Sequence, residues 1–225
     1  MLDAKRGVLF SKLAKKVSIA AREGGSGDPA HNFKLRMVIE KAKEASMPND
    51  NIERAIKKGL GGDGSTAISE ITYEGYGPFG TAFLVEAATD NNNRTVSNIK
   101  HIFSKHGGNL GASGSVAWQF KTRGQILVER HDADLSKLAM SAIDAGAEDV
   151  RESAEGLEIY TRPDELNKIK EAIFSSSGVI AQAEIIQEST QGVDLTEQQK
   201  PKVDALFSEL ENDEDVIAVH TSANL

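Results

Sequence analysis

The residue types that could perform catalysis or hold a metal are few and poorly spaced for either task. The 225 residues include no cysteine, which excludes disulfide scaffolds, cysteine-ligated zinc and thiol catalysis and fits a reducing compartment. His101 and His106 are five positions apart, whereas two ligands on one helical face are three or four apart. The run Asp90–Asn93 lacks the glycine and the distal glutamate of a calcium loop. We expect no metal and no cofactor.

Two other segments resemble functional sites only in part. Gly59–Ser65 (GLGGDGS) is rich in glycine but lacks the Gly-Lys-Ser/Thr ending of a phosphate-binding loop, so a flexible linker is the favoured interpretation. The carboxylates between Asp144 and Glu158 stand among polar residues and are more typical of a solvated face than of an acid/base pair. Without a nucleophile context or a dinucleotide fingerprint, the sequence predicts a protein that is not an enzyme and takes no small-molecule substrate.

Cations on short helices are the stronger signal. In Met47–Gly61 (MPNDNIERAIKKGLG), a helix is expected after Pro48, with Asp50 and Glu53 in the pattern of a capping box and glycines at its end. At about 100° per residue, its apolar and cationic side chains fall on opposite sides. The apolar residues are Ile52, Ala55 and Ile56, and the cations are Arg54, Lys57 and Lys58. These cations either complement the helix dipole only or bind an anionic partner.

Two earlier segments repeat this pattern. One helix is expected over Lys5–Arg22. A second is expected from Asp28-Pro29, a cap followed by proline at the first helical position, to about Ser46. Both carry an apolar stripe with cations beside or across from it. Three short helices with short connections predict a three-helix bundle.

Charge is divided unevenly along the chain, whose net charge is −8. Residues 1–60 carry 13 Lys+Arg against 7 Asp+Glu, and residues 61–225 carry 13 against 27. This split predicts a basic module for an anionic partner, carried on acidic domains, unless the surface charge is merely uneven. No apolar run approaches the ~20 residues of a membrane span and no signal peptide is visible, so we expect a cytoplasmic protein without a membrane partner.

The remainder of the chain alternates strand and helix patterns in two series. The second series contains a strand, a helix, two paired strands, a helix and a strand: Gln125–Arg130, Leu135–Ala145, Asp149–Glu152, Leu157–Thr161, Asp164–Ser175 and Ile180–Gln187. The order β-α-β-β-α-β predicts a ferredoxin-like unit.

The first series falls short of that order. It has a strand, a helix, a short extended piece and another strand: Thr81–Thr89, a helix through Phe103, Asn109–Leu110 and Ser115–Phe120. A helix and a strand that could complete it stand at the end of the chain, over Glu197–Glu211 and Val216–Val219. The expected fold class is therefore α+β, with an N-terminal three-helix bundle plus two ferredoxin-like α/β domains, one inserted into the other. The expected domains are residues 1–75, residues 76–122 with 192–225, and the inserted residues 123–191.

Two aromatic residues fall on one face of the expected strand Ser115–Phe120. Trp118 and Phe120 are residue types that stack on bases in RNA-binding sheets of this fold. Because aromatic residues make up only 5% of the chain and this domain is acidic, core packing is favoured over base stacking.

Six motifs carry a resemblance to a known family. They are DAKRG at Asp3–Gly7, MPNDNIERAIKKG at Met47–Gly59, YEGYGP at Tyr73–Pro78, TDNNNRT at Thr89–Thr95, FSKHGGNLGASGSVAW at Phe103–Trp118 and AGAEDV at Ala145–Val150. In these motifs the chain resembles the YebC/PmpR family of probable transcriptional regulatory proteins, whose mitochondrial relatives act as translational activators. The resemblance implies a helical N-terminal domain plus two α/β domains, a cytoplasmic location, nucleic-acid binding and no catalysis.

The sequence departs from the family pattern in three places. A basic lead segment with Ser-Lys-Trp is absent ahead of Asp3. Asn92 stands where the family often has Arg, which removes a cation beside Arg94, and Phe79 stands where it often has Gly.

Two functions are expected from the residues and the resemblance together. The first is a transcriptional regulator that binds DNA through the basic N-terminal helices. The second is a ribosome-associated translation factor or translational activator that binds ribosomal or transfer RNA by shape and phosphate contacts. An adaptor that binds proteins through the acidic domains is a third alternative.

The cations favour a partner that is recognised by shape. No helix-turn-helix reading head with Asn, Gln and Arg is visible, and the cations are mostly lysine, which suits phosphates and supplies little sequence information. The expected nucleic-acid-binding residues are Lys5, Arg6, Lys12, Lys15, Lys16, Arg36, Lys43, Arg54, Lys57, Lys58 and Arg94.

Overall fold

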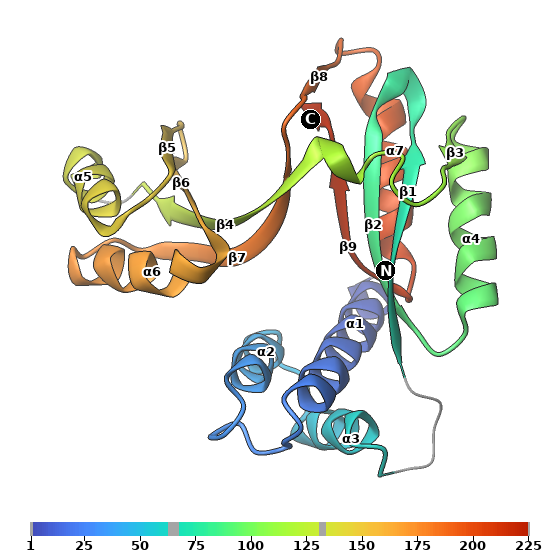
Figure 1. Cartoon of the computed structure of the whole chain (residues 1–225), viewed down its shortest axis with the longest axis horizontal. Coiled ribbons are helices and arrows are strands. Elements are labelled where there is room, and N and C mark those ends of the chain that lie inside the picture. Colours follow the sequence, from blue (N-terminus) through green and yellow to red (C-terminus); the bar gives the residue numbers. More distant parts are fainter. Residues whose placement is uncertain (1, 63–67, 131–133, 225) are drawn as a thin grey trace. The chain divides into compact units, whose positions relative to one another are not determined.

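The computed structural model describes residues 2–62, 68–130 and 134–224, with side chains from Arg6 onward. The chain forms two compact units, one made of the residues up to Ala117 together with those from Gly192 onward, and the other made of Trp118–Gln191. Figure 1 shows the elements of both units.

The first unit begins with three helices: α1 (Leu2–Glu23), α2 (Phe33–Glu44) and α3 (Asn49–Gly59). Helix α1 packs against both of the others. Their apolar stripes form one buried cluster that includes Leu13, Val17, Ala21, Leu35, Ile39, Ile52 and Ala55. The predicted three-helix bundle is confirmed.

Helix α2 begins later than predicted, and its cap is a different residue. Asn32 precedes the helix, and its side-chain oxygen accepts a hydrogen bond from the Leu35 amide at 3.0 Å. The Asn32 amide group also donates to the Ala20 carbonyl at 2.8 Å, which joins the start of α2 to α1. The predicted cap at Asp28 is wrong because that carboxylate accepts from the Ala30 amide in the preceding turn.

Helix α3 ends as predicted but begins without the predicted capping box. Pro48 occupies the cap position, and no side chain accepts a hydrogen bond there. At the other end, Gly59 lies against α1 so closely that a Cβ on it would be 2.2 Å from the Ser18 carbonyl oxygen. Gly61, with φ +77°, then takes the left-handed conformation that ends the helix.

The first unit continues with an antiparallel sheet in the order β3-β1-β2-β9. These strands are β1 (Ser69–Tyr76), β2 (Ala82–Thr89), β3 (Asn109–Leu110) and β9 (Val216–Thr221). Helices α4 (Asn92–Lys105) and α7 (Lys200–Asn212) cover one face, and their apolar residues share a core with Phe83, Val85 and Ala87 of β2. On the other face, Ile19 of α1 packs against Ile68 and Ala88.

One strand of this sheet differs from the prediction. The segment Ser115–Phe120 was expected as a strand, but it contains the short helix η2 (Ala117–Gln119), and the missing strand is β1. Strand β1 lies between β2 and β3 in the sheet, and the resulting order β9-β2-β1-β3 is that of a ferredoxin-like sheet. Glu74 of β1 explains why Ser115–Phe120 is not a strand. Its buried carboxylate accepts hydrogen bonds from the amides of Gly114, Val116 and Ala117 at 2.6–2.7 Å and fixes that segment as a loop.

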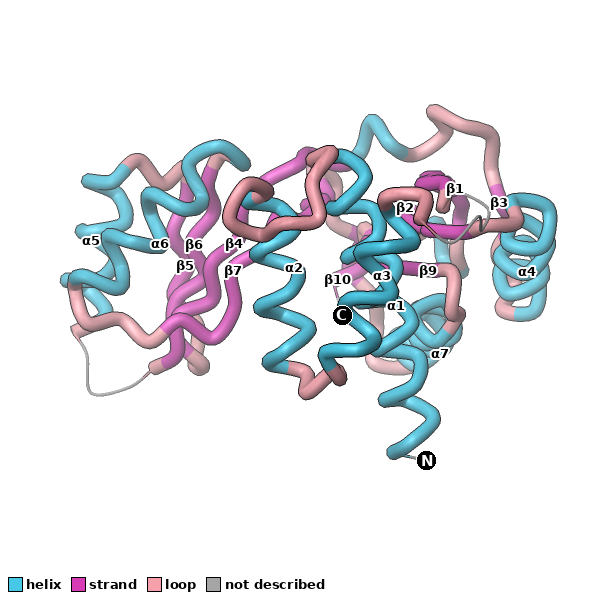
Figure 2. Tube along the Cα trace, turned by 90° about the horizontal axis from the view of Figure 1, so that it is seen from below, coloured by secondary structure: helices cyan, strands magenta, loops and turns pink. Residues whose placement is uncertain are grey.

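The second unit contains β4 (Phe120–Glu129), α5 (Leu135–Ala145), β5 (Asp149–Glu152), β6 (Gly156–Thr161), α6 (Leu166–Ser175) and β7 (Ile180–Ser189). The strand order is β5-β6-β4-β7, and every pair is antiparallel. Helices α5 and α6 cover one face of this sheet (Figure 2) and share a buried core with Ile126 and Ile159. This is the predicted ferredoxin-like order, and the predicted α+β fold class is confirmed.

Short elements complete the chain: η1 (Pro78–Gly80), η3 (Pro163–Glu165), and the parallel pair β8 (Val193–Asp194) and β10 (Ala223–Asn224). The expected boundary between residues 75 and 76 falls inside β1, and the one between residues 122 and 123 falls inside β4. Among the described helices, none is both long and apolar enough to cross a membrane.

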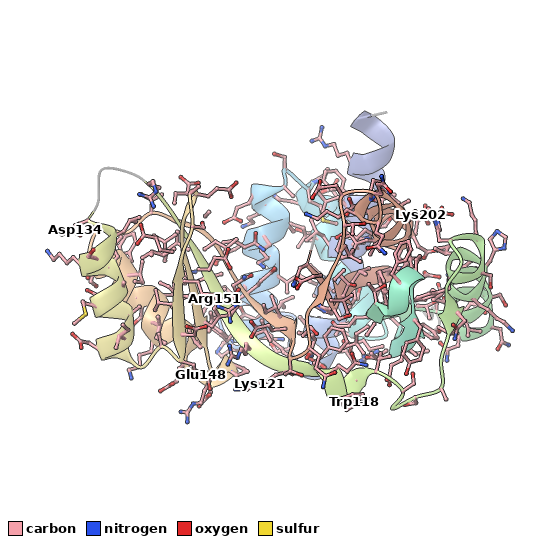
Figure 3. The ribbon with its side chains drawn as sticks, turned by 90° about the horizontal axis from the view of Figure 1, so that it is seen from above. Trp118, Lys121, Asp134, Glu148, Arg151 and Lys202 are labelled. Atoms are coloured by element: carbon pink, nitrogen blue, oxygen red, sulfur yellow. The ribbon has the colours of Figure 1, made fainter. Side chains whose placement is uncertain are left out.

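The packing interpretation of Trp118 is wrong. Its side chain lies in η2 and is 63% exposed (Figure 3), because the segment leaves the first sheet instead of pairing within it. Phe120 is half-buried at the start of β4.

Candidate nucleic-acid interface

Five of the predicted cations are exposed on the helical bundle, and they are distributed over all three of its helices. They are Arg6 on α1, Arg36 and Lys43 on α2, and Arg54 and Lys57 on α3. Two of them lie over aromatic rings of their own helices, Arg6 over Phe10 and Arg36 over Phe33, each at 5.2 Å from the ring centroid. Lys5 lies in α1, and its side chain is outside the described residues.

Within the described residues, Arg54 and Lys58 of α3 make few contacts with other side chains. The Arg54 guanidinium donates to the Asp50 carbonyl at 3.2 Å and to the Asn51 side-chain oxygen, both on its own helix. Lys58 is less exposed than its neighbours, at 33%, and its Nζ is 4.0 Å from Asp90 Oδ2. An exposed pair at this distance contributes little to stability, so these cations can bind phosphates at small cost.

Two lysines of α1 that were predicted to bind nucleic acid have partners within the first unit. Lys15 is 19% exposed, and its Nζ donates to the Glu214 carbonyl at 2.7 Å and to Asp215 Oδ1 at 2.6 Å. Lys12 Nζ donates to the Glu211 carbonyl. The acidic segment Glu211–Asp215, which runs from the end of α7 to the residue before β9, therefore binds both of these cations.

Lys12 and Lys16 are half-buried on the same helix. Burial lowers the pKa of Lys12, although the nearby Glu211 opposes this effect. The charge of Lys16 contributes to a lowered pKa of Glu86, whose main cause is the hydrogen bond with His220 at 3.1 Å.

Asp215 is the centre of these contacts, and its side chain is only 6% exposed. Besides Lys15, it binds the Arg94 guanidinium, with Nη2 at 2.8 Å from Oδ2, and accepts from the Thr95 hydroxyl at 2.7 Å. Burial by itself raises the pKa of Asp215, but the hydrogen bonds from Lys15, Thr95 and Arg94 outweigh it and lower the pKa to about 2. The carboxylate therefore joins α1, α4 and the start of β9.

Arg94 is the predicted site residue outside the bundle. It is half exposed, and its guanidinium is bound to Asp215. Its guanidinium also contacts Asp90 Oδ1 at 3.3 Å. With two carboxylates bound, Arg94 is a poorer phosphate ligand than Arg54 or Lys57.

Sequence reasoning missed both Asp215 and Glu74. Asp215 contacts a lysine 200 positions earlier, and Glu74 contacts amides about 40 positions later. No local pattern marks a carboxylate that binds such distant partners, although the run Asp213–Asp215 before a predicted strand is the kind of segment in which one could be sought.

A groove lies between α1 and α3, with a volume of about 490 Å³. We call it the α1–α3 groove. Its lining residues are Phe10, Ser11, Ala14, Lys15, Ser18, Met47, Asn51, Arg54, Ala55, Lys58 and Ile68. The lining therefore combines apolar side chains with the cations Lys15, Arg54 and Lys58.

The second unit carries a different kind of charge cluster on the open face of its sheet. Lys121, Glu148 and Arg151 gather there (Figure 3). Arg151 lies over the Tyr160 ring at 4.2 Å from its centroid, and its guanidinium is 2.9 Å from Glu188 Oε1. These cations are neutralised by carboxylates, so this face offers less attraction to phosphates than the bundle does.

The carboxylates around Asp144–Glu158 take part in such ion pairs. Glu148 contacts Lys121 at 3.3 Å and Glu152 contacts Arg130 at 2.8 Å. Within residues 2–62, 68–130 and 134–224, no group of three or more His, Asp or Glu side chains is arranged to hold a metal ion.

Two family models match this chain. The family model described as "TACO1/YebC protein N-terminal domain" matches residues 2–62, and the model described as "TACO1/YebC second and third domain" matches residues 68–223. Together they cover nearly the whole chain and confirm the resemblance that the motifs indicated.

Individual relatives match nearly all of this chain and about nine-tenths of their own length. A probable transcriptional regulatory protein of Thermoanaerobacter pseudethanolicus is 47% identical over 225 residues, which are 100% of this chain and 91% of the relative. One of Desulfosudis oleivorans is 49% identical over 223 residues, 99% of this chain and 90% of the relative. The crystal structure of a conserved hypothetical protein from Aquifex aeolicus has a TM-score of 0.87 at 43% identity and covers 100% of this chain and 92% of that one.

Proposed function

Because the chain belongs to the TACO1/YebC family, whose relatives are named as probable transcriptional regulatory proteins, we propose that it is a regulator of gene expression that binds DNA through its helical bundle. No catalytic step is part of this proposal. The protein acts in the cytoplasm, where its nucleic-acid partners are found.

The single observation that carries the proposal is the exposure of Arg54 and Lys57 on α3. They belong to a basic module in a chain whose net charge is −8. Arg36 and Lys43 on α2 are exposed as well. Exposed cations on a rigid helical module bind the phosphates of a duplex, while the acidic remainder of the chain disfavours other docking orientations.

A specific observation favours RNA as a second candidate partner. Lys12 and Lys15 are bound to the segment Glu211–Asp215. Helix α1 therefore lacks a continuous row of exposed cations over its described residues, and such a row would be needed to lie along a major groove. Contacts from scattered cations suit a folded RNA that is recognised by shape, and the protein would then act in translation on the ribosome.

The experiment that tests the proposal compares partners at one salt concentration. The full chain is titrated with duplex DNA and with duplex RNA of the same sequence, and it is sedimented with ribosomes. The proposal predicts salt-dependent binding to the DNA duplex. Tighter RNA binding together with co-sedimentation would replace it by the second candidate. No binding to either duplex and no co-sedimentation with ribosomes would contradict both.

A further inference from the structure

The α1–α3 groove has the chemistry of a site for a flat, anionic ligand. One wall is apolar and includes the ring of Phe10 and the side chains of Met47, Ala55 and Ile68. Three cations line the groove; Lys15 is already paired with Asp215, which leaves Arg54 and Lys58 for an anionic ligand. None of the described lining residues carries a carboxylate, although acidic residues outnumber basic ones in the whole chain.

The spacing of these groups narrows the choice of ligand. Arg54 and Lys58 are four residues apart on α3, so their side chains leave the same side of the helix one turn apart. Neighbouring phosphates of one strand can each meet one of them. Asn51 also lines the groove; its side-chain oxygen accepts from Arg54, and its NH2 group can donate to the polar edge of a base.

We infer that the α1–α3 groove holds one unpaired nucleotide of the bound nucleic acid, with its base against Phe10 and its flanking phosphates on Arg54 and Lys58. This inference rests on the proposed function. A base inside a duplex presents only its edge, whereas an extruded base presents a flat apolar face that fits such a groove. The volume of about 490 Å³ lies within the range of pockets that enclose small organic ligands.

The inference is tested with two hairpins that differ by one unpaired nucleotide in the stem, each made as RNA and as DNA. The full chain is titrated with each by fluorescence anisotropy at the same salt. Stacking and burial of one base predict about 5- to 100-fold tighter binding of the bulged hairpin, in whichever nucleic acid is the partner.

A variant that fills the groove separates base binding from phosphate binding. Ser11→Phe adds a ring to the groove at a half-exposed position of α1 without changing any charge. It is expected to remove the preference for the bulge and to leave the affinity for the uninterrupted hairpin unchanged. The matched control is Leu9→Phe, which adds a ring at an exposed position of the same helix outside the groove and is expected to keep the preference.

If Ser11→Phe fails to fold, a cross-linking measurement on the unaltered protein takes its place. A 4-thiouridine at the bulge, activated by light, is expected to cross-link to groove residues such as Phe10, Met47 or Asn51. Equal affinity for the two hairpins, or cross-links confined to residues outside the groove, would overturn this inference alone. No binding to any hairpin would overturn the proposed function as well.

Discussion

At Asp215 one buried carboxylate binds a cation from α1 and a cation and a hydroxyl from α4. Its pKa of about 2 in the folded protein lies below the ordinary value of 3.8. A folded-state pKa that is lower than the unfolded one stabilises the folded state at pH values above 4, and this stabilisation is lost as the pH falls toward 2. The contribution of the carboxylate at neutral pH is about 2 kcal/mol.

Asp215→Asn keeps the shape of the side chain and removes its charge. We expect the free energy of unfolding to fall by about 2 kcal/mol at pH 7, because Lys15 and Arg94 lose their shared counter-ion. The difference from the wild-type protein should shrink between pH 4 and pH 2, where the wild-type carboxylate takes up its proton. Urea unfolding of both proteins across this range measures it, and a difference that stays constant with pH would contradict the network.

Glu74 is a second carboxylate with an internal role. Burial raises its pKa, but hydrogen bonds from three backbone amides outweigh this effect and the pKa is lowered overall. Glu74→Gln puts an amide group opposite those donors, and we expect a loss of about 2–3 kcal/mol in the free energy of unfolding. Limited proteolysis of this variant should then cut within residues 111–117. If that loop stays protected from the protease, the Glu74 carboxylate does not fix its conformation.

Among the elements, the contact of α1 with α3 builds the walls of the α1–α3 groove. It depends on Gly59, where a Cβ would meet the Ser18 carbonyl at 2.2 Å. The Ser18 hydroxyl also donates to the Ala55 carbonyl at 2.7 Å, which fixes the register of the two helices. Only glycine permits this close approach.

Gly59→Ala should therefore force the two helices apart and lower the free energy of unfolding by about 3 kcal/mol, as overpacking does elsewhere. Gly7→Ala is the matched control, because Gly7 lies in α1 with no atom within 4 Å of the position of its Cβ. The control is expected to be neutral or slightly stabilising. Thermal unfolding of both variants measures the effect, and equal midpoints would mean that the contact is loose.

Most helices and strands could be predicted because the spacing of apolar residues that marks them lies within the element itself. The helices of the bundle, α5 and the strands of the second unit were all visible in the spacing of apolar residues. The segment Ser115–Phe120 was misassigned because Val116, Trp118 and Phe120 alternate as in a strand, while the carboxylate that keeps it a loop is on Glu74. Strand β1 was missed because its burial alternates only weakly and its position in the sheet is set by β2 and β3.

Phe79 illustrates the same limit at a single turn. It has φ +62° and ψ 23°, a conformation in which glycine is favoured, and the Lys202 ammonium lies 5.8 Å from the centroid of its ring. The departure from the glycine often found at this place in the family is visible in the sequence. The positive φ and the contact with Lys202 are visible only in the structure.

For the whole molecule, the second unit is an insertion whose ends meet. The Thr190 amide donates to the Gln119 carbonyl at 2.7 Å, and Phe120 pairs with Ser189. We expect that replacing residues 118–191 with a short Gly/Ser linker leaves the first unit folded, with cooperative unfolding in denaturant. Deletion of residues 192–225 should instead abolish cooperative unfolding, because β9 and α7 leave the first sheet and its core. The opposite pattern would contradict the insertion.

The candidate interface could be predicted only in part from the sequence. Arg54 and Lys57 are exposed as their helical spacing indicated, because the apolar side of α3 is local information. Lys12 and Lys15 have the same spacing on α1, but their partners lie at the other end of the chain. Which cations are free to meet phosphates is thus decided by tertiary contacts.

The salt dependence of duplex binding tests the central claim most directly. The wild-type chain is compared with Arg54→Ala/Lys57→Ala/Lys58→Ala and with a control that removes three exposed cations from the second unit, Lys137→Ala/Arg162→Ala/Lys168→Ala. Each phosphate contact contributes about 0.9 to the slope of log K against log salt on DNA. We predict that the α3 variant binds every sequence more weakly with a slope flatter by roughly 2–3 units, while the control keeps the wild-type slope. An α3 variant that folds and retains wild-type affinity and slope would contradict the claim that the bundle binds nucleic acid through α3.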